Sequence, residues 1–149
     1  MKTRLLNLLL IALAALAASS CRELSQDGDL AGQWQILTIE HPDGTVTNPE
    51  GHNYYCFYRN VCQLTNTNTT RITANMVYNE SGATITLDFP YESISNLKPW
   101  GITQAGSALT PDVAPDPDTK TITIKINHLT SSRLTMTAPG GNVITCRKY

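Results

Sequence analysis

The ten residues Ala31-Gly32-Gln33-Trp34-Gln35-Ile36-Leu37-Thr38-Ile39-Glu40 decide the fold that we predict for this 149-residue chain. They form the first long run of β-branched and aromatic side chains, and they open on Gly32-Gln33-Trp34. A glycine two positions before a tryptophan lets another part of the chain approach closely where a large ring must be buried. We therefore expect a strand over residues 31–40, with Trp34 and Ile36 on one face.

Residues 1–20 have the features of a cleaved secretion signal. Lys2 and Arg4 precede an apolar segment over residues 5–18 that only Asn7 interrupts. The segment spans roughly 21 Å as a helix, whereas the hydrocarbon core of a bilayer is about 30 Å thick. Because it is too short for a stable membrane span, we predict that the chain is exported and the leader removed.

Small residues precede Cys21 in the order Leu16-Ala17-Ala18-Ser19-Ser20-Cys21. This run resembles the lipobox of bacterial lipoproteins, which implies that Cys21 is acylated and anchors the protein in a membrane. Several acyl chains hold a protein on a membrane where one chain does not. Because residue 22 is Arg rather than Asp, we favour the outer membrane and leave its face open. Ordinary secretion, with Cys21 as a thiol, is the alternative.

Length and charge limit the domain count and the partners. We expect residues 21–29 to form a flexible polar tether and residues 30–149 to form one domain. The whole chain has a formal charge of −1, and the leader holds two of its eleven Lys and Arg residues and none of its twelve acids, so the mature charge is −3. Nucleic-acid and anionic-lipid surfaces are bound through basic patches. We therefore expect no nucleic-acid partner, and membrane attachment through lipid alone.

Strand-like alternation continues along the chain, over residues 53–65, 71–78, 83–89, 121–127, 133–137 and 143–148. Short turns join most of these segments, which predicts an all-β antiparallel up-and-down meander of seven or eight strands. Closing it into a small barrel removes the exposed edges, and an open sandwich is the competing architecture. The exception is the segment of residues 90–120, which contains five prolines. We expect it to form one long loop that carries a short helix near residues 92–97.

Residues 53–65 can form either one long strand or a hairpin of two strands. This choice decides whether the barrel has seven or eight strands. If the chain turns at residues 58–60, Cys56 and Cys62 face each other and can form a disulfide. If it is one strand, these thiols lie about 20 Å apart and cannot be bridged. We favour one long strand with unbridged thiols, because Arg59-Asn60 is a weak turn signal.

Gly32, Trp34 and Arg147 resemble a pattern of the lipocalins and other calycins. In that superfamily a Gly-x-Trp near the start packs beneath a basic residue from the last strand. The resemblance implies a lipocalin-like barrel in which Arg147 covers the Trp34 indole through a cation–π contact and closes one end. Tyr54-Tyr55-Cys56-Phe57, the turn at residues 127–132 and the ending at residues 145–149 are similar to small lipocalin-like lipoproteins of Gram-negative anaerobes, most without an assigned function.

The sequence predicts no catalytic or metal site. Nucleophile-elbow, P-loop and dinucleotide-binding motifs are absent. The three histidines lie in or beside predicted turns, and His52 and Cys56 would be about 13 Å apart on a strand, too far to share a zinc ion. We therefore expect neither an enzyme nor a cofactor.

Two hypotheses on function remain. In the first, the barrel binds a small apolar or amphipathic molecule, with Trp100 on a lid over the lining residues Tyr54, Tyr58, Met76, Tyr78 and Met136. In the second, the barrel is filled, and the protein docks an outer-membrane partner or inhibits an enzyme through residues 90–120. A void of roughly 300 Å³ or more favours the first, and a packed interior favours the second.

Overall fold

The computed structural model describes residues 28–49, 52–67, 70–103, 106–107 and 120–149. The leader, Cys21 and most of the predicted tether lie outside these ranges. The strands are β1 (Gly32–Glu40), β2 (Val46–Thr47), β3 (Tyr54–Tyr58), β4 (Val61–Thr65), β5 (Arg71–Asn79), β6 (Thr84–Asp88), β7 (Gly106–Ser107), β8 (Thr121–Leu129), β9 (Arg133–Thr137) and β10 (Val143–Lys148). Two 3-10 helices accompany them, η1 (Gly28–Leu30) and η2 (Ile94–Trp100). Within these described ranges, neither helix has the length and apolar character needed to cross a membrane.

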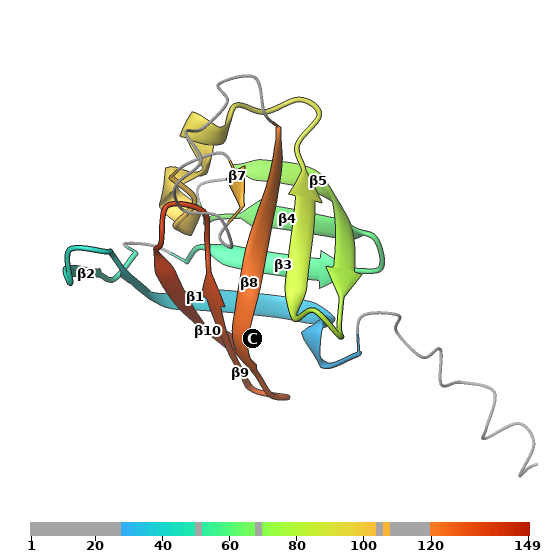
Figure 1. Cartoon of the computed structure of the whole chain (residues 1–149), viewed down its shortest axis with the longest axis horizontal. Helices are drawn as coiled ribbons and strands as arrows, with labels where there is room; N and C mark the ends of the chain where they lie inside the picture. Colours follow the sequence, from blue (N-terminus) through green and yellow to red (C-terminus); the bar gives the residue numbers. More distant parts are fainter. Residues whose placement is uncertain (1–27, 50–51, 68–69, 104–105, 108–119) are drawn as a thin grey trace, which may run out of the picture.

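Eight strands form a closed antiparallel barrel, in the order β1, β3, β4, β5, β6, β8, β9 and β10 (Figure 1). The seam lies between the first and last strands, where β1 pairs with β10 from Trp34 opposite Lys148 to Glu40 opposite Val143. The barrel prediction is therefore confirmed, and the open sandwich is excluded. Of the two remaining strands, β2 extends a hairpin from the end of β1, and β7 pairs in parallel with β8.

Residues 53–65 form a hairpin, so the expectation of one long strand is wrong. The strands β3 and β4 meet at Arg59-Asn60, where Arg59 has a φ of 52°. Cys62 lies opposite Phe57 and Cys56 opposite Gln63, so the two thiols occupy opposite faces of the hairpin. All three cysteines in the described part of the chain are free thiols. Cys56 and Cys62 are therefore kept apart by the two faces of a hairpin and not by the length of a single strand.

A bulge in β1 adapts the opening stretch to the barrel wall. The register against β10 shifts between Ile36 and Thr38, so two residues of β1 oppose one of its partner. As a result the apolar residues on both sides of the bulge, Trp34 and Ile36 before it and Ile39 after it, are all buried. The bulge therefore converts an apolar run that lacks strict alternation into one continuous inward face.

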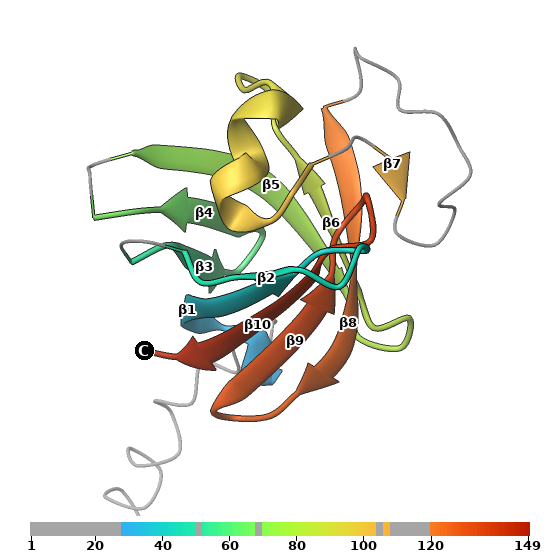
Figure 2. The same cartoon turned by 90° about the vertical axis from the view of Figure 1, so that its left-hand side faces the viewer.

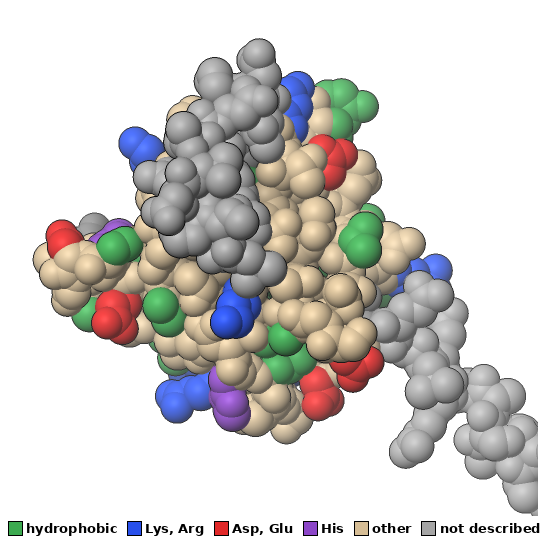
Figure 3. Space-filling model, viewed as in Figure 1, with side chains coloured by type: hydrophobic (Ala, Val, Ile, Leu, Met, Phe, Trp, Pro, Cys, Tyr) green, Lys and Arg blue, Asp and Glu red, His purple; other side chains and the backbone are tan. Residues whose placement is uncertain are grey.

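The two helices lie at opposite ends of the barrel (Figure 2). We call these the η1 end, where β1 begins, and the η2 end, where the long connection between β6 and β8 passes over the strands. This connection carries η2, which confirms the short helix predicted in residues 90–120. Residues 104–105 and 108–119 of the same loop lie outside the described residues. On the outside of the barrel, uncharged polar side chains and backbone cover most of the part of the face that Figure 3 does not draw in grey, and the charged side chains there are scattered.

Candidate functional site

The barrel interior is the first place to look for a site, and three of the predicted lining residues lie there. Met76 and Met136 are 2% and 0% exposed and belong to the core, and Tyr78 is partly buried against it. Trp100 is 1% exposed and belongs to the same core, at the end of η2. Met76, Met136 and Trp100 therefore belong to one hydrophobic core and Tyr78 packs against it, although Tyr78 and Trp100 lie towards opposite ends of the barrel.

Tyr54 and Tyr58 lie outside the barrel, so their predicted place in the lining is wrong. Tyr58 is 65% exposed, and Tyr54 packs against the rings of His52 and Tyr149. The inward rings of β3 are Tyr55 and Phe57, which stack with centroids 5.7 Å apart. Four of the five residues of β3 are aromatic and the fifth is cysteine. Local periodicity therefore does not indicate whether Tyr55 and Phe57 or the alternate residues of β3 face inward.

The interior is packed along the middle of the barrel. A side chain that borders a ligand-sized void exposes surface to it, whereas a side chain in a close-packed core does not. Eight interior residues from five strands are 0% exposed, namely Ala74, Ile85, Leu87, Ile124, Leu134, Met136, Ile144 and Cys146. No ligand-sized space borders these eight side chains.

A set of hydrogen bonds fixes η2 over its end of the barrel. The Trp100 indole Nε1 donates to Thr65 O at 3.2 Å, and the Tyr55 hydroxyl donates to Trp100 O at 2.6 Å. Asn53 Nδ2 donates to Pro99 O at 2.7 Å, and Asn142 Nδ2 donates to Gly101 O at 2.8 Å. Because these partners come from three separate parts of the chain, residues 53–55, Thr65 and Asn142, the cap is tied to several sides of the rim.

Trp34 and Lys148 close the η1 end. The Trp34 indole Nε1 donates to Leu30 O at 2.7 Å, which holds η1 beneath the ring. Lys148 Nζ lies 5.1 Å from the ring centroid and donates to Asp29 O at 3.0 Å. A Cβ on Gly32 would lie 2.9 Å from Lys148 Cε, so the glycine leaves room for the lysine stem.

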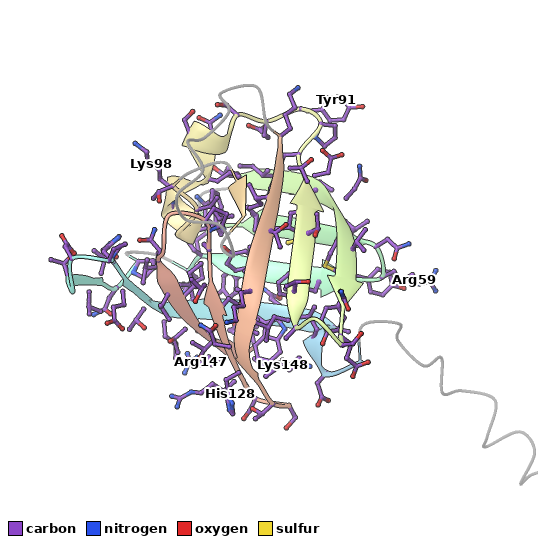
Figure 4. All side chains as sticks on the ribbon, viewed as in Figure 1. Arg59, Tyr91, Lys98, His128, Arg147 and Lys148 are labelled. Atoms are coloured by element: carbon purple, nitrogen blue, oxygen red, sulfur yellow. The ribbon has the colours of Figure 1, made fainter. Side chains whose placement is uncertain are left out.

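Arg147 does not cover the Trp34 indole, so that part of the calycin expectation is wrong. Arg147 lies opposite Gln35 in the ladder and points outward, and its Nε donates to Gln35 Oε1 at 2.9 Å. Lys148 is the residue opposite Trp34. The roles of Gly32 and Trp34 are as expected, whereas the basic residue is one position later. Figure 4 labels both basic side chains near the C-terminal end of β10.

The buried titratable groups of the core are held in their neutral forms. Burial raises the pKa of Tyr55 and of Cys62 well above their ordinary values, with smaller contributions from neighbouring thiols. Burial alone raises the pKa of Cys146 from 9.0 to about 12. A thiol is nucleophilic as a thiolate, so these two cysteines are inert in the folded protein. The described residues contain no group of three His, Cys, Asp or Glu side chains placed to hold a metal ion.

Comparison with known proteins agrees with this architecture. The family model described as a lipocalin-like domain matches residues 14–149. A lipocalin-like protein from Bacteroides uniformis superposes with a TM-score of 0.59 at 23% identity, over 82% of this chain and 100% of its own. An uncharacterized protein from Bacteroides eggerthii gives a TM-score of 0.52 at 20% identity, over 80% and 98% of the two chains. No curated protein matches the chain significantly. Since the family model covers most of the sequence and the barrel closes as that fold requires, the chain belongs to the lipocalin-like domain family.

Proposed function

We propose that this protein is an exported, lipid-anchored, non-catalytic protein that works through the outer surface of a filled lipocalin-like barrel. The observation that carries the proposal is the 0% exposure of eight interior side chains, which leaves no ligand-sized space beside them. Lipocalin-like barrels form a fold suited to small-molecule binding. In this chain η2 occupies one end of the barrel and Trp34 with Lys148 the other, so the outer wall is the surface offered to partners.

The lipid anchor is the part of the proposal that rests on the sequence. Cys21 follows a lipobox-like run, and η1 begins at Gly28. Six intervening residues reach about 20 Å when extended, which places the barrel close to the membrane. Cys21→Ala should release the protein from the membrane fraction, whereas Cys56→Ala should leave it bound. Detection of acyl chains on the N-terminal peptide by mass spectrometry supports the anchor, and an unmodified Cys21 thiol contradicts it.

Binding of a small apolar molecule inside the barrel is the second candidate, and Met76 and Met136 favour it. Both side chains lie in the core, and methionine adapts its shape to irregular neighbours better than branched residues do. The cap is held to the rim by the hydrogen bonds described above. An apolar ligand would therefore enter only if Trp100 moved away and the methionines repacked.

Native mass spectrometry of the full chain purified from its host separates the two candidates. A filled barrel gives the mass of the lipidated protein alone, and added indole leaves the melting temperature unchanged. Trp100→Ala serves as the positive control, because removing a buried ring opens a cavity that can take an apolar probe. Tyr91→Ala is the matched control, because Tyr91 is 93% exposed and its removal opens no buried cavity. A co-purifying apolar molecule in the wild type would overturn the filled-barrel proposal.

A further inference from the structure

We propose that the outer wall carries an oxyanion site, formed by Arg133, Arg147 and His52, that binds the carboxylate of an acidic sugar. This inference rests on the proposed function, because it assigns a ligand class to the outer surface. It begins from a row of side chains that crosses the barrel seam. In the ladder, Arg133 lies opposite Arg147, Arg147 opposite Gln35, and Gln35 opposite Tyr54.

The two arginines are an unfavourable pair without a bound anion. Residues directly opposite each other on neighbouring strands have Cβ atoms about 5 Å apart, and like charges there destabilise a sheet. Among the described residues, neither guanidinium has a carboxylate partner, and the one side-chain hydrogen bond of the pair joins Arg147 to Gln35. The next outward-facing row contains no acid; it consists of Thr38, Thr145 and Thr135, with His128 opposite Thr135 on β8. An anion between the arginines would relieve this repulsion.

Gln35 fixes the direction of the hydrogen bonds around the site. Arg147 Nε–H can only donate, so Gln35 Oε1 accepts at 2.9 Å. The amide NH₂ of Gln35 therefore faces His52 and donates to Nδ1 at 2.7 Å, which places the neutral imidazole proton on Nε2. Gln35 is 7% exposed and is held between its two partners. His52 Nε2–H and the terminal guanidinium groups consequently remain as donors at the surface, and a carboxylate accepts from such donors.

Aromatic rings next to these donors favour a ligand with a ring. Tyr149 is 76% exposed and meets the covered ring of Tyr54 edge-on, with centroids 5.4 Å apart and planes at 76°. The His52 ring lies 6.1 Å from Tyr54. Partial burial raises the pKa of Tyr54, and the nearby Tyr149 raises it further, so its hydroxyl stays protonated. A tyrosine with one apolar face and one polar edge suits a ligand that is itself amphipathic, as a sugar ring is.

The test is an NMR titration of the full chain, with labelled arginine side chains, against D-glucuronate. We expect a shift of the Arg147 Nε–H resonance with a dissociation constant of about 1 mM, and no shift with D-glucose, which lacks the carboxylate. Added salt should weaken binding, because exposed charges are screened over about 8 Å at physiological ionic strength.

Variants show whether the arginine pair is responsible. Arg147→Gln and Arg133→Gln should each weaken glucuronate binding about three- to tenfold. Arg71→Gln is the matched control, because Arg71 is an exposed, outward arginine on β5, the far end of the same row. No side-chain hydrogen bond or ion pair is made by Arg133 within the described residues, so Arg133→Gln remains informative if Arg147→Gln perturbs the fold.

Three results would overturn the inference. One is equal weakening by Arg71→Gln, and another is equal binding of glucose and glucuronate. The third is binding of the chain to phosphatidylglycerol vesicles without any shift by glucuronate, which would identify a membrane surface instead. Each of these leaves the filled-barrel proposal standing, because that proposal is tested by an apolar probe of the interior and not by these side chains.

Discussion

Lys148 Nζ lies 5.1 Å from the centre of the Trp34 ring and joins the last strand of the barrel to the first. The contact has two physical parts, a cation over a ring and an aliphatic stem that passes across Gly32. We expect Lys148→Ala to lower the free energy of unfolding by about 1–2 kcal/mol, and Lys148→Met, which keeps most of the stem, by about 0.5–1 kcal/mol. Urea denaturation measures both.

Lys125→Ala is the control for this pair of variants. Lys125 is exposed on β8 and makes no side-chain hydrogen bond or ion pair within the described residues, so its removal should change stability by less than about 0.5 kcal/mol. If Lys148→Ala has no larger effect than Lys125→Ala, the lysine does not stabilise the seam.

Gly32→Ala tests the backbone at the same end of the barrel. Gly32 has a φ of 127°, a conformation that side-chain-bearing residues rarely adopt. We expect a loss of about 1–3 kcal/mol from the strained backbone. The new methyl group would also meet Lys148 Cε, but that atom is the flexible end of a side chain and can move. The loss should therefore persist in the Lys148→Ala background. A double variant as stable as Lys148→Ala alone would assign the cost to the contact instead.

Tyr55→Phe tests the cap at the η2 end. The substitution removes the hydroxyl that donates to Trp100 O and leaves a buried carbonyl without this donor, at a cost of about 1–3 kcal/mol. Tyr58→Phe, at the exposed end of the same strand, should change stability by less than about 0.5 kcal/mol. Equal urea midpoints for the two variants would mean that the hydroxyl contributes nothing to holding η2.

The buried thiols predict a loss of stability at alkaline pH. The pKa of Cys146 is raised from 9.0 to about 12 in the folded protein, so the unfolded chain gives up this proton first. Its contribution to stability is complete below pH 9 and is lost as the pH rises towards 12. The raised pKa values of Cys62 and Tyr55 also make the folded protein less stable as the pH rises.

Urea midpoints measured across this alkaline range should fall, and Cys146→Ala should reduce the fall without abolishing it. The absolute stability of the variant is not the readout, because the smaller side chain leaves a cavity in the core. An identical pH dependence in wild type and variant would show that this thiol ionises as easily folded as unfolded.

Most of the strands were predictable because their signal is local. Apolar and polar residues alternate in β6 and in β5 as far as Met76, and the burial along both strands follows a period of two, with Val77 of β5 at an outward, exposed position. A strand with one buried face needs no information from elsewhere to be recognised. The closed barrel followed from the same pattern, because a meander of such strands leaves two edges that pair with each other at the seam.

The hairpin at Arg59-Asn60 and the faces of β3 were not predictable in this way. Arg59 adopts a left-handed φ of 52°, which arginine does not favour and which the tertiary structure around it imposes. Tyr54 and Tyr55 are chemically alike, so only the pairing of β3 with β1 decides which of them enters the core.

Alternation and the opening Gly-x-Trp are properties of neighbouring residues, and they are enough to predict an all-β barrel with Trp34 in its core. That Lys148 covers the indole while Arg147 joins Gln35 on the outer wall depends on how β1 and β10 pair in the folded barrel. The register of this pairing cannot be read from either strand alone. Successive residues of a strand point to opposite faces, so a difference of one position between β1 and β10 moves a charge from the closed end of the core to the outer surface.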